Sequence, residues 1–159
     1  MVVGSNIAKF SVIAVVAFGL GGCDSDTEAQ ELPAGWEDAE RVSNLIQHEC
    51  AGTALVEHDE RATFVTSDGS LDVRYEDAHF RCEQDVEGFF KDSGDALDIL
   101  VQPVDMNPSS PTRCDCLYEI TFAIAPLAGS RQATLFRRWD DLNEPNDPVE
   151  IASETVAGE

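Results

Sequence analysis

The clearest hydrophobic pattern in the chain lies between residues 114 and 124, where apolar side chains alternate with mostly polar ones. One parity carries Cys114, Cys116, Tyr118, Ile120, Phe122 and Ile124, and the other carries Asp115, Leu117, Glu119, Thr121 and Ala123. Successive side chains of a strand point to opposite faces, so this alternation predicts a strand with one face in the core. Both cysteines share the core parity, which predicts disulfides inside the apolar layer.

A β-hairpin is predicted upstream of this strand. Residues 62–66 and 71–75 alternate in the same way, and Asp68-Gly69 between them is a turn signal. The apolar parity then shifts from Leu71, Val73 and Tyr75 to Ala78, Phe80 and Cys82. A shift of one residue within a strand predicts a β-bulge at Glu76-Asp77.

A second hairpin is predicted from residues 88–91 and 96–101, with Leu97, Ile99 and Val101 on one face. Pro103, Pro108 and Pro111 mark the loop that follows, and residues 133–139 and 148–152 supply two short strands. About six or seven strands joined by turns favour an antiparallel β-sandwich of the immunoglobulin-like kind. We expect one such domain, spanning residues 36–156.

A short helix is predicted at residues 37–50, ahead of the strands. Its basis is a spacing of three and four residues between apolar side chains, followed by Gly52 as a possible stop. The side chains are those of Trp36, Ala39, Val42, Leu45, Ile46 and Cys50. The alternative is an extended chain from Val42 to Val56.

The start of the chain has the pattern of a signal peptide. Lys9 precedes the apolar run of residues 10–20, which is too short for a membrane-spanning helix of ~20 residues. Leu20-Gly21-Gly22-Cys23 resembles the bacterial lipobox, and the alternative is an ordinary secretory peptide. The resemblance implies a signal-peptide helix in residues 1–22, cleavage before Cys23 and up to three acyl chains on that cysteine.

Such an anchor would hold the protein at the cell membrane or the outer membrane, facing the periplasm or the exterior, since two acyl chains already bind stably. Residues 23–35 are polar and without periodicity, which favours a flexible tether between the lipid and the domain. Asp24 resembles an inner-membrane retention signal that varies among bacteria, so it does not select a membrane.

The net charge limits the kinds of partner that the chain can bind. The chain carries 31 Asp and Glu against 10 Lys and Arg, and removing residues 1–22 removes Lys9 and no acid, so the mature charge is −22. This charge excludes the usual electrostatic footprint of nucleic-acid binding. It also repels anionic lipid head groups, so membrane contact must come from acyl chains on Cys23.

Four cysteines remain after Cys23, at positions 50, 82, 114 and 116, and in an oxidising compartment they predict two disulfides. Cys114 and Cys116 are two apart on one strand, ~6.6 Å at strand geometry and near the limit for a bridge. We therefore expect Cys50 and Cys82 each to pair with one of them, in either combination. The alternative is a zinc site using Cys82, Cys114, Cys116 and either His79 or Cys50.

Part of the chain is similar to a group of uncharacterised bacterial lipoproteins, in which a cysteine precedes a C-x-C-x-Y strand. The matching residues are Val73-Arg-Tyr75, Cys82, Leu97-Asp-Ile99 and Cys114-Asp-Cys116-Leu-Tyr118-Glu-Ile120-Thr-Phe122. The resemblance covers about half of the mature chain. It implies a small extracytoplasmic β domain with no assigned activity and no site residues.

No catalytic residue and no cofactor are predicted. The sequence contains no nucleophile elbow, S-x-x-K motif or P-loop, and His48-Glu49 lacks the second histidine of a zinc protease. His48, His58 and His79 are dispersed, and with 31 acids in the chain a His–Asp neighbour is expected by chance.

Two weaker features suggest binding. Asp140, Asp141, Asn143 and Asp147 form an oxygen-rich cluster suited to calcium, although Pro145 interrupts the spacing and the calcium-loop glycine is missing, which favours a solvated acidic turn. Phe89-Phe90 and Arg137-Arg138-Trp139 suggest an exposed contact patch, the alternative being that a second sheet or the N-terminal helix covers it.

Together these features predict a membrane-anchored lipoprotein that acts as a non-enzymatic binding or structural module, with a protein of the cell envelope as its partner. The alternative is an extracytoplasmic hydrolase or a calcium-dependent module built from clustered carboxylates.

Overall fold

The computed structural model describes residues 32–53, 59–105, 114–141, 144–145 and 147–158, and these residues form strands and no helix. The strands are β1 (Glu40–Arg41), β2 (Ile46–Gln47), β3 (Gly52–Thr53), β4 (Arg61–Ser67), β5 (Ser70–Arg81), β6 (Val86–Asp92), β7 (Ala96–Pro103), β8 (Asp115–Ile124), β9 (Ser130–Arg137), β10 (Asp140–Asp141), β11 (Glu144–Pro145) and β12 (Val149–Ala157). The prediction of a mainly β fold is confirmed.

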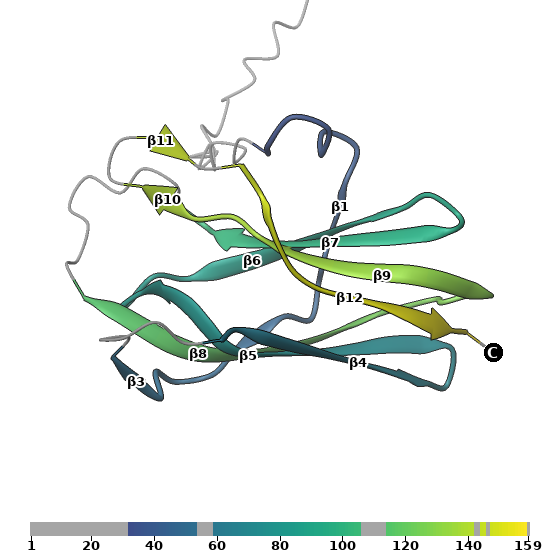
Figure 1. Cartoon of the computed structure of the whole chain (residues 1–159), viewed down its shortest axis with the longest axis horizontal. Helices are drawn as coiled ribbons and strands as arrows, with labels where there is room; N and C mark the ends of the chain where they lie inside the picture. The colour runs from purple at the N-terminus through teal and green to yellow at the C-terminus, as the bar shows by residue number, and fades with distance from the viewer. Residues whose placement is uncertain (1–31, 54–58, 106–113, 142–143, 146, 159) are drawn as a thin grey trace, which may run out of the picture.

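Two five-stranded sheets pack face to face (Figure 1). Sheet A has the order β1-β6-β7-β9-β12, and sheet B has the order β2-β8-β5-β4, with β3 also paired to β8. Within the described residues all ladders are antiparallel except β7–β9, which is parallel. That pair arises because the chain passes through β8 in sheet B between the two strands. The arrangement agrees with the predicted sandwich, and the parallel pair departs from an all-antiparallel one.

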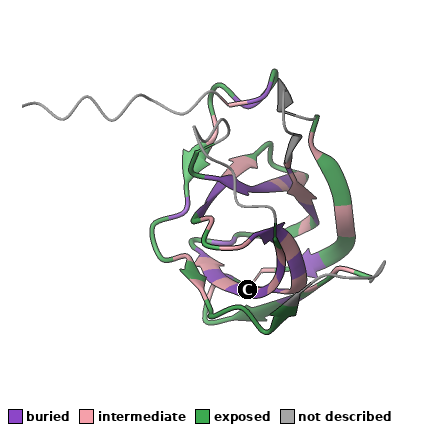
Figure 2. Ribbon diagram, turned by 90° about the vertical axis from the view of Figure 1, so that its left-hand side faces the viewer, coloured by how far each residue is buried: buried purple, intermediate pink, exposed green. Residues whose placement is uncertain are grey.

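The main core lies between the two sheets, where the buried faces of both meet (Figure 2). The inward parity of β8 is confirmed, because Cys116, Tyr118, Ile120, Phe122 and Ile124 are at most 6% exposed. Cys114 does not continue that face. It lies before the first residue of β8 and is exposed, so the expectation that both cysteines enter the apolar layer is wrong for Cys114.

The first hairpin and its bulge are confirmed. β4 and β5 pair up to Ser67 and Ser70, and the two turn residues between them have the left-handed φ values that this tight turn requires, 50° at Asp68 and 72° at Gly69. The ladder between β5 and β8 shifts register between Tyr75 and Ala78. The shift moves the alternation of β5 by one residue, so Tyr75 and Ala78 both face the core.

The second hairpin is also confirmed, as β6 and β7, with Leu97, Ile99 and Val101 at most 1% exposed. The strands expected at residues 133–139 and 148–152 are β9 and β12, with bounds shifted by a few residues. The loop expected at Pro108 and Pro111 lies outside the described residues.

The prediction of a helix at residues 37–50 is wrong. Residues 32–53, which we call the N-terminal strap, follow an extended path around one side of the sandwich (Figure 1). β1 adds to the edge of sheet A beside Phe89 and Phe90, and β2 then adds to the edge of sheet B beside Ile120 and Thr121.

The helical spacing has a different physical cause. Trp36 and Ala39 pack on the outer face of sheet A, whereas Val42 and Leu45 enter the main core between the sheets. The apolar stripe of a helix faces one direction, so it could not contact both the outer face and the inner face of sheet A. The strap is therefore extended. Gly88 on β6 permits the close approach, because a Cβ there would lie 3.1 Å from Leu45 Cδ1 and 3.2 Å from Val42 Cγ2.

Two disulfides staple one end of sheet B. Cys50 pairs with Cys116 and Cys82 pairs with Cys114, with Cα–Cα distances of 5.8 and 5.5 Å. The expectation that Cys50 and Cys82 each take one partner from the C-x-C pair is confirmed. The first bridge fixes the strap to β8, and the second joins the end of β5 to the residue before β8.

Candidate functional site

A buried polar cluster lies at the end of the sandwich where β4 and β8 begin. Glu60 precedes β4, Tyr75 and His79 lie on either side of the β5 bulge, and Arg137 ends β9. Glu60 Oε1 accepts hydrogen bonds from Tyr75 OH at 2.9 Å, the His79 backbone N–H at 2.7 Å and Arg137 Nη1 at 3.0 Å. We call these four residues the Glu60 cluster.

The electrostatics of the Glu60 cluster favour a structural role. The side chains of Glu60 and Arg137 are 12% and 18% exposed, so a largely desolvated ion pair joins sheet B to sheet A. Arg137 Nη1 also donates to the His79 carbonyl at 3.2 Å. Burial raises the pKa of Tyr75 well above its usual value, and the charge of Glu60 raises it further, so the phenol stays neutral and donates. The carboxylate is therefore engaged by donors from two sheets.

The histidine of the Glu60 cluster also lies next to an aspartate. His79 Nε2 lies 3.5 Å from Asp115 Oδ2, and its ring lies 4.7 Å from the ring of Trp139. In a hydrolase of the catalytic-triad type, such a base and orienting carboxylate act together with a nucleophile. The four cysteines are paired in disulfides and supply no thiol. His48 lies elsewhere, 3.3 Å from Thr121 Oγ1, and His58 is outside the described residues.

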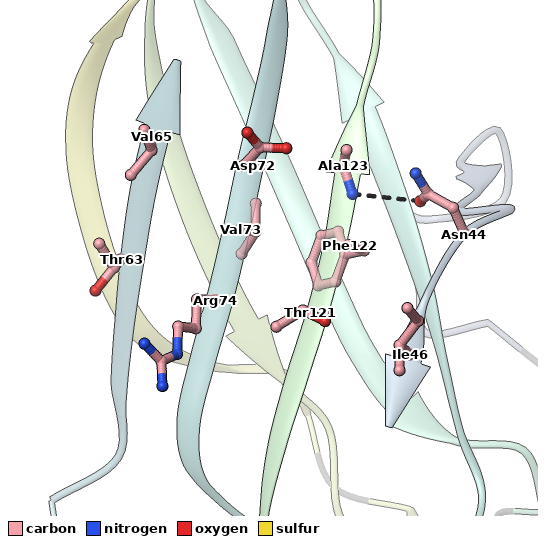
Figure 3. A pocket seen from close by; sticks show the side chains of 10 residues that line it. All are labelled: Asn44, Ile46, Thr63, Val65, Asp72, Val73, Arg74, Thr121, Phe122 and Ala123. Carbon is pink, nitrogen blue, oxygen red and sulfur yellow. Dashed lines mark hydrogen bonds between the residues drawn. The ribbon is translucent and has the colours of Figure 1, made fainter. Parts of the chain in front are cut away.

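The outer face of sheet B contains an open hollow of about 560 Å³, which we call the sheet-B hollow (Figure 3). It crosses β2, β8, β5 and β4 and is lined by Asn44, Ile46, Thr63, Val65, Asp72, Val73, Arg74, Thr121, Phe122 and Ala123. The strand register places its outward side chains in two rows. One row is Val65, Asp72 and Ala123, and the other is Thr63, Arg74, Thr121 and Ile46.

The hollow exists because side-chain size varies along each row. Ala123 and Thr121 on β8 are small, whereas Val65 on β4 and Ile46 on β2 rise on either side. Both of these apolar side chains are unusually open to solvent, Val65 at 52% and Ile46 at 58% exposed. These two side chains add apolar surface to the two sides of the depression.

Two charged side chains, Arg74 and Asp72, line the hollow, and they differ in their counter-ions. Arg74 donates from Nε, at 3.1 Å, and from Nη2 to Glu119 Oε2, and its Nη2 lies 3.4 Å from Glu76. The hydrogen bond to Glu119 raises the pKa of Arg74, so the guanidinium is charged and already paired. The Asp72 carboxylate makes no hydrogen bond or ion pair with any described residue. In Figure 3 the Arg74 side chain points away from it.

The other predicted site residues fall in different places. Cys23 and Asn143 lie outside the described residues, and Asp140 and Asp141 form β10, of whose side chains nothing is described. Asp147 is exposed. In the part of the chain that the structure describes, no three His, Cys, Asp or Glu side chains gather as metal ligands. The zinc alternative is wrong, since Cys50, Cys82, Cys114 and Cys116 are all in disulfides.

The predicted aromatic contact patch is also wrong. Phe89 is 8% exposed because Trp36 of the strap packs on it, and Trp139 packs against the main core. Arg138 is buried as well. The alternative was cover by a second sheet or by the N-terminal helix. The extended strap covers Phe89, and Phe90 and Trp139 pack against the core between the two sheets. The sheet-B hollow was missed, although small residues on the outward parity of the 114–124 strand were a signal for it.

Among the described residues, no helix is long and apolar enough to cross a membrane. Searches with this chain against protein-family models, curated proteins and solved structures found no match. The lipobox and the resemblance to C-x-C-x-Y lipoproteins therefore stay predictions.

Proposed function

We propose that the protein is a bacterial lipoprotein whose immunoglobulin-like sandwich is a non-enzymatic binding module, and that the outer face of sheet B contacts a protein of the cell envelope. The observation that carries the proposal is the contrast between the two outer faces. The strap covers the outer face of sheet A over Phe89 and Leu100 of β6 and β7, whereas the outer face of sheet B is open and hollowed.

The position of the tether supports this orientation. The described chain begins at Leu32, which packs with Trp36 on the outer face of sheet A. Cys23 and Leu32 are nine residues apart, so the segment between them reaches at most ~30 Å. A lipid on Cys23 would hold the sheet-A side toward the membrane. The sheet-B hollow, on the opposite side of the sandwich, would then face a partner.

The anchor is tested by expressing the full chain in a bacterium with radiolabelled palmitate. We expect the wild-type protein to be labelled and to sediment with membranes, and Cys23→Ser to remove both properties. Cys114→Ser is the matched control, because it removes a disulfide cysteine and leaves the lipobox intact. An unlabelled wild-type protein, or a Cys23→Ser variant that is still labelled, contradicts the anchor.

The binding face is tested by photo-crosslinking in the native envelope, with p-benzoylphenylalanine in place of Val65 or of Ser153. Val65 rises beside the hollow, and Ser153 is exposed on sheet A, where its hydroxyl contacts Gln132 and Thr134. We expect a discrete adduct from position 65 and none from position 153. Equal adducts from both positions, or an adduct from position 153 alone, contradict the proposed face.

A further inference from the structure

A carboxylate without a counter-ion lies within the sheet-B hollow. The ladders place Asp72 directly between Val65 on β4 and Ala123 on β8. It shares its face of β5 with Arg74, two residues along, but that guanidinium is held by Glu119 and Glu76. Asp72 therefore presents an unneutralised negative charge beside exposed aliphatic surface (Figure 3).

The chemistry of the hollow selects among ligands. A purely apolar group would cover Asp72 and remove its water without replacing it, which is unfavourable. An anion would be repelled by Asp72 and by the chain's net charge of −21. A side chain with an aliphatic stem and a cationic head meets both requirements, since the stem packs on apolar surface and the head pairs with the carboxylate.

We propose that the sheet-B hollow binds a lysine or arginine side chain of a basic segment of the partner protein, with Asp72 as its counter-ion. This inference rests on the proposed function, since it names the chemistry recognised by the same face. The stem of the basic side chain lies over Ala123 against Val65, and its head lies on Asp72.

The charge of the whole chain acts in the same direction. A strongly acidic protein attracts a basic partner over distances comparable with the Debye length and accelerates the encounter. The same charge opposes pairing of this face with a second copy of the chain, because each copy would bring its own excess of acids. A basic partner is therefore favoured over self-association.

The test is a chemical-shift titration of the ¹⁵N-labelled full chain in non-ionic detergent. The probe is the peptide acetyl-Thr-Val-Lys-Val-Thr-amide, and two control peptides carry norleucine or glutamate in place of lysine. We expect the lysine peptide to shift the amides of Asp72 and Ala123, with an affinity at least about tenfold higher than that of either control, and to bind more weakly as salt is raised.

Asp72→Asn is expected to weaken binding of the lysine peptide about tenfold. Asp95→Asn is the matched control, since it removes the same charge from the exposed turn between β6 and β7, and we expect no change in affinity.

Three outcomes overturn the inference. Equal weakening by Asp72→Asn and Asp95→Asn would mean that only bulk charge attracts the peptide. Equal binding of the norleucine peptide would mean that the face is an apolar one, which leaves the proposed function standing. An absence of shifts with all three peptides overturns the basic side chain as ligand, whereas the proposed binding face is overturned by the crosslinking outcomes given above.

Discussion

The two sheets have five strands each, but their outer faces have very different surroundings. On sheet A, Phe89 and Leu100 are covered by Trp36, and even the outward polar residues Glu87 and Gln102 are at most 6% exposed. On sheet B, the outward residues of β4 and the first half of β5 are largely exposed. The chain uses its own N-terminal strap to bury the β6 and β7 part of one outer face, and the other outer face has no such cover among the described residues.

Under the proposed function, this difference gives one outer face a structural role and the other a binding role. The aromatic residues of the covered face stabilise the sandwich and hold the strap, because Lys91 lies 4.3 Å above the Trp36 ring and donates to the Gly35 carbonyl at 2.9 Å. The open face holds Arg74 in exposed pairs with Glu119 and Glu76, leaves Asp72 without a counter-ion among the described residues, and keeps two large aliphatic side chains in water. Under the proposed function, a partner would cover these two side chains.

The largest expected effect comes from removing the cover of sheet A. Trp36→Ala should lower the free energy of unfolding by about 3–5 kcal/mol, because it leaves a cavity over Phe89 and Leu100. Ile46→Ala on the open face is the control and should change it by less than ~0.5 kcal/mol. Urea unfolding measures both, and equal losses would show that the two faces are not differently covered.

A buried ion pair and an exposed one should also differ in how much stability is lost when one partner is removed. Glu60→Ala should cost about 3 kcal/mol, because it leaves Arg137 and the donors from Tyr75 and His79 without their acceptor. Glu119→Ala removes the exposed partner of Arg74 on the open face and should cost at most ~1 kcal/mol. Thermal unfolding of the two variants provides the comparison, and a large loss from Glu119→Ala would contradict the assignment of an exposed, solvated face.

The pH dependence of thermal stability tests, through a smaller effect, whether the carboxylate of Glu87 on sheet A is desolvated. Burial raises the pKa of Glu87 above 4.5, although Gln102 and the Arg41 charge partly oppose the shift. A raised pKa means that the stability contribution is full below the unfolded pKa and is lost as pH rises through the folded one. Glu87→Gln should therefore raise Tm at pH 7 relative to wild type, and this gain should vanish below pH ~4.

Glu37→Gln is the control of opposite sign. The Gly35 backbone N–H donates to the Glu37 carboxylate and lowers its pKa, so its contribution is present above the unfolded pKa and is lost as pH falls. Differential scanning calorimetry across pH 3–8 compares the two variants. A Tm difference for Glu87→Gln that does not depend on pH would mean that the carboxylate of Glu87 is not desolvated.

Local patterns predicted the local parts of this fold. The parity of β8, the Asp68-Gly69 turn and the bulge at Glu76-Asp77 depend on neighbouring residues, and each is in place. The strap was mispredicted because its apolar residues contact two separate clusters, which a helical period resembles. The exclusion of Cys114 from the core could not be foreseen either, since it depends on where β8 begins.

Neither of the two polar sites could be predicted from local sequence patterns. The Glu60 cluster joins residues up to 77 positions apart, so no local spacing indicated it. The sheet-B hollow depends on the register of four strands, which sets Val65 beside Asp72 and Asp72 beside Ala123. Sequence patterns identify which side chains of a strand face outward, but they do not identify which of them become neighbours.

Hydroxyl-radical footprinting of the isolated protein and of the protein in its native envelope tests the contrast between the two faces most directly. In the isolated protein we expect Ile46 and Val65 to be oxidised almost as fast as in the unfolded chain. Trp36 should be oxidised much more slowly than in the unfolded chain. In the envelope, Ile46 and Val65 should become protected while Trp36 is unchanged. Unprotected Trp36 in the isolated protein, or unchanged oxidation of Ile46 and Val65 in the envelope, would contradict the account.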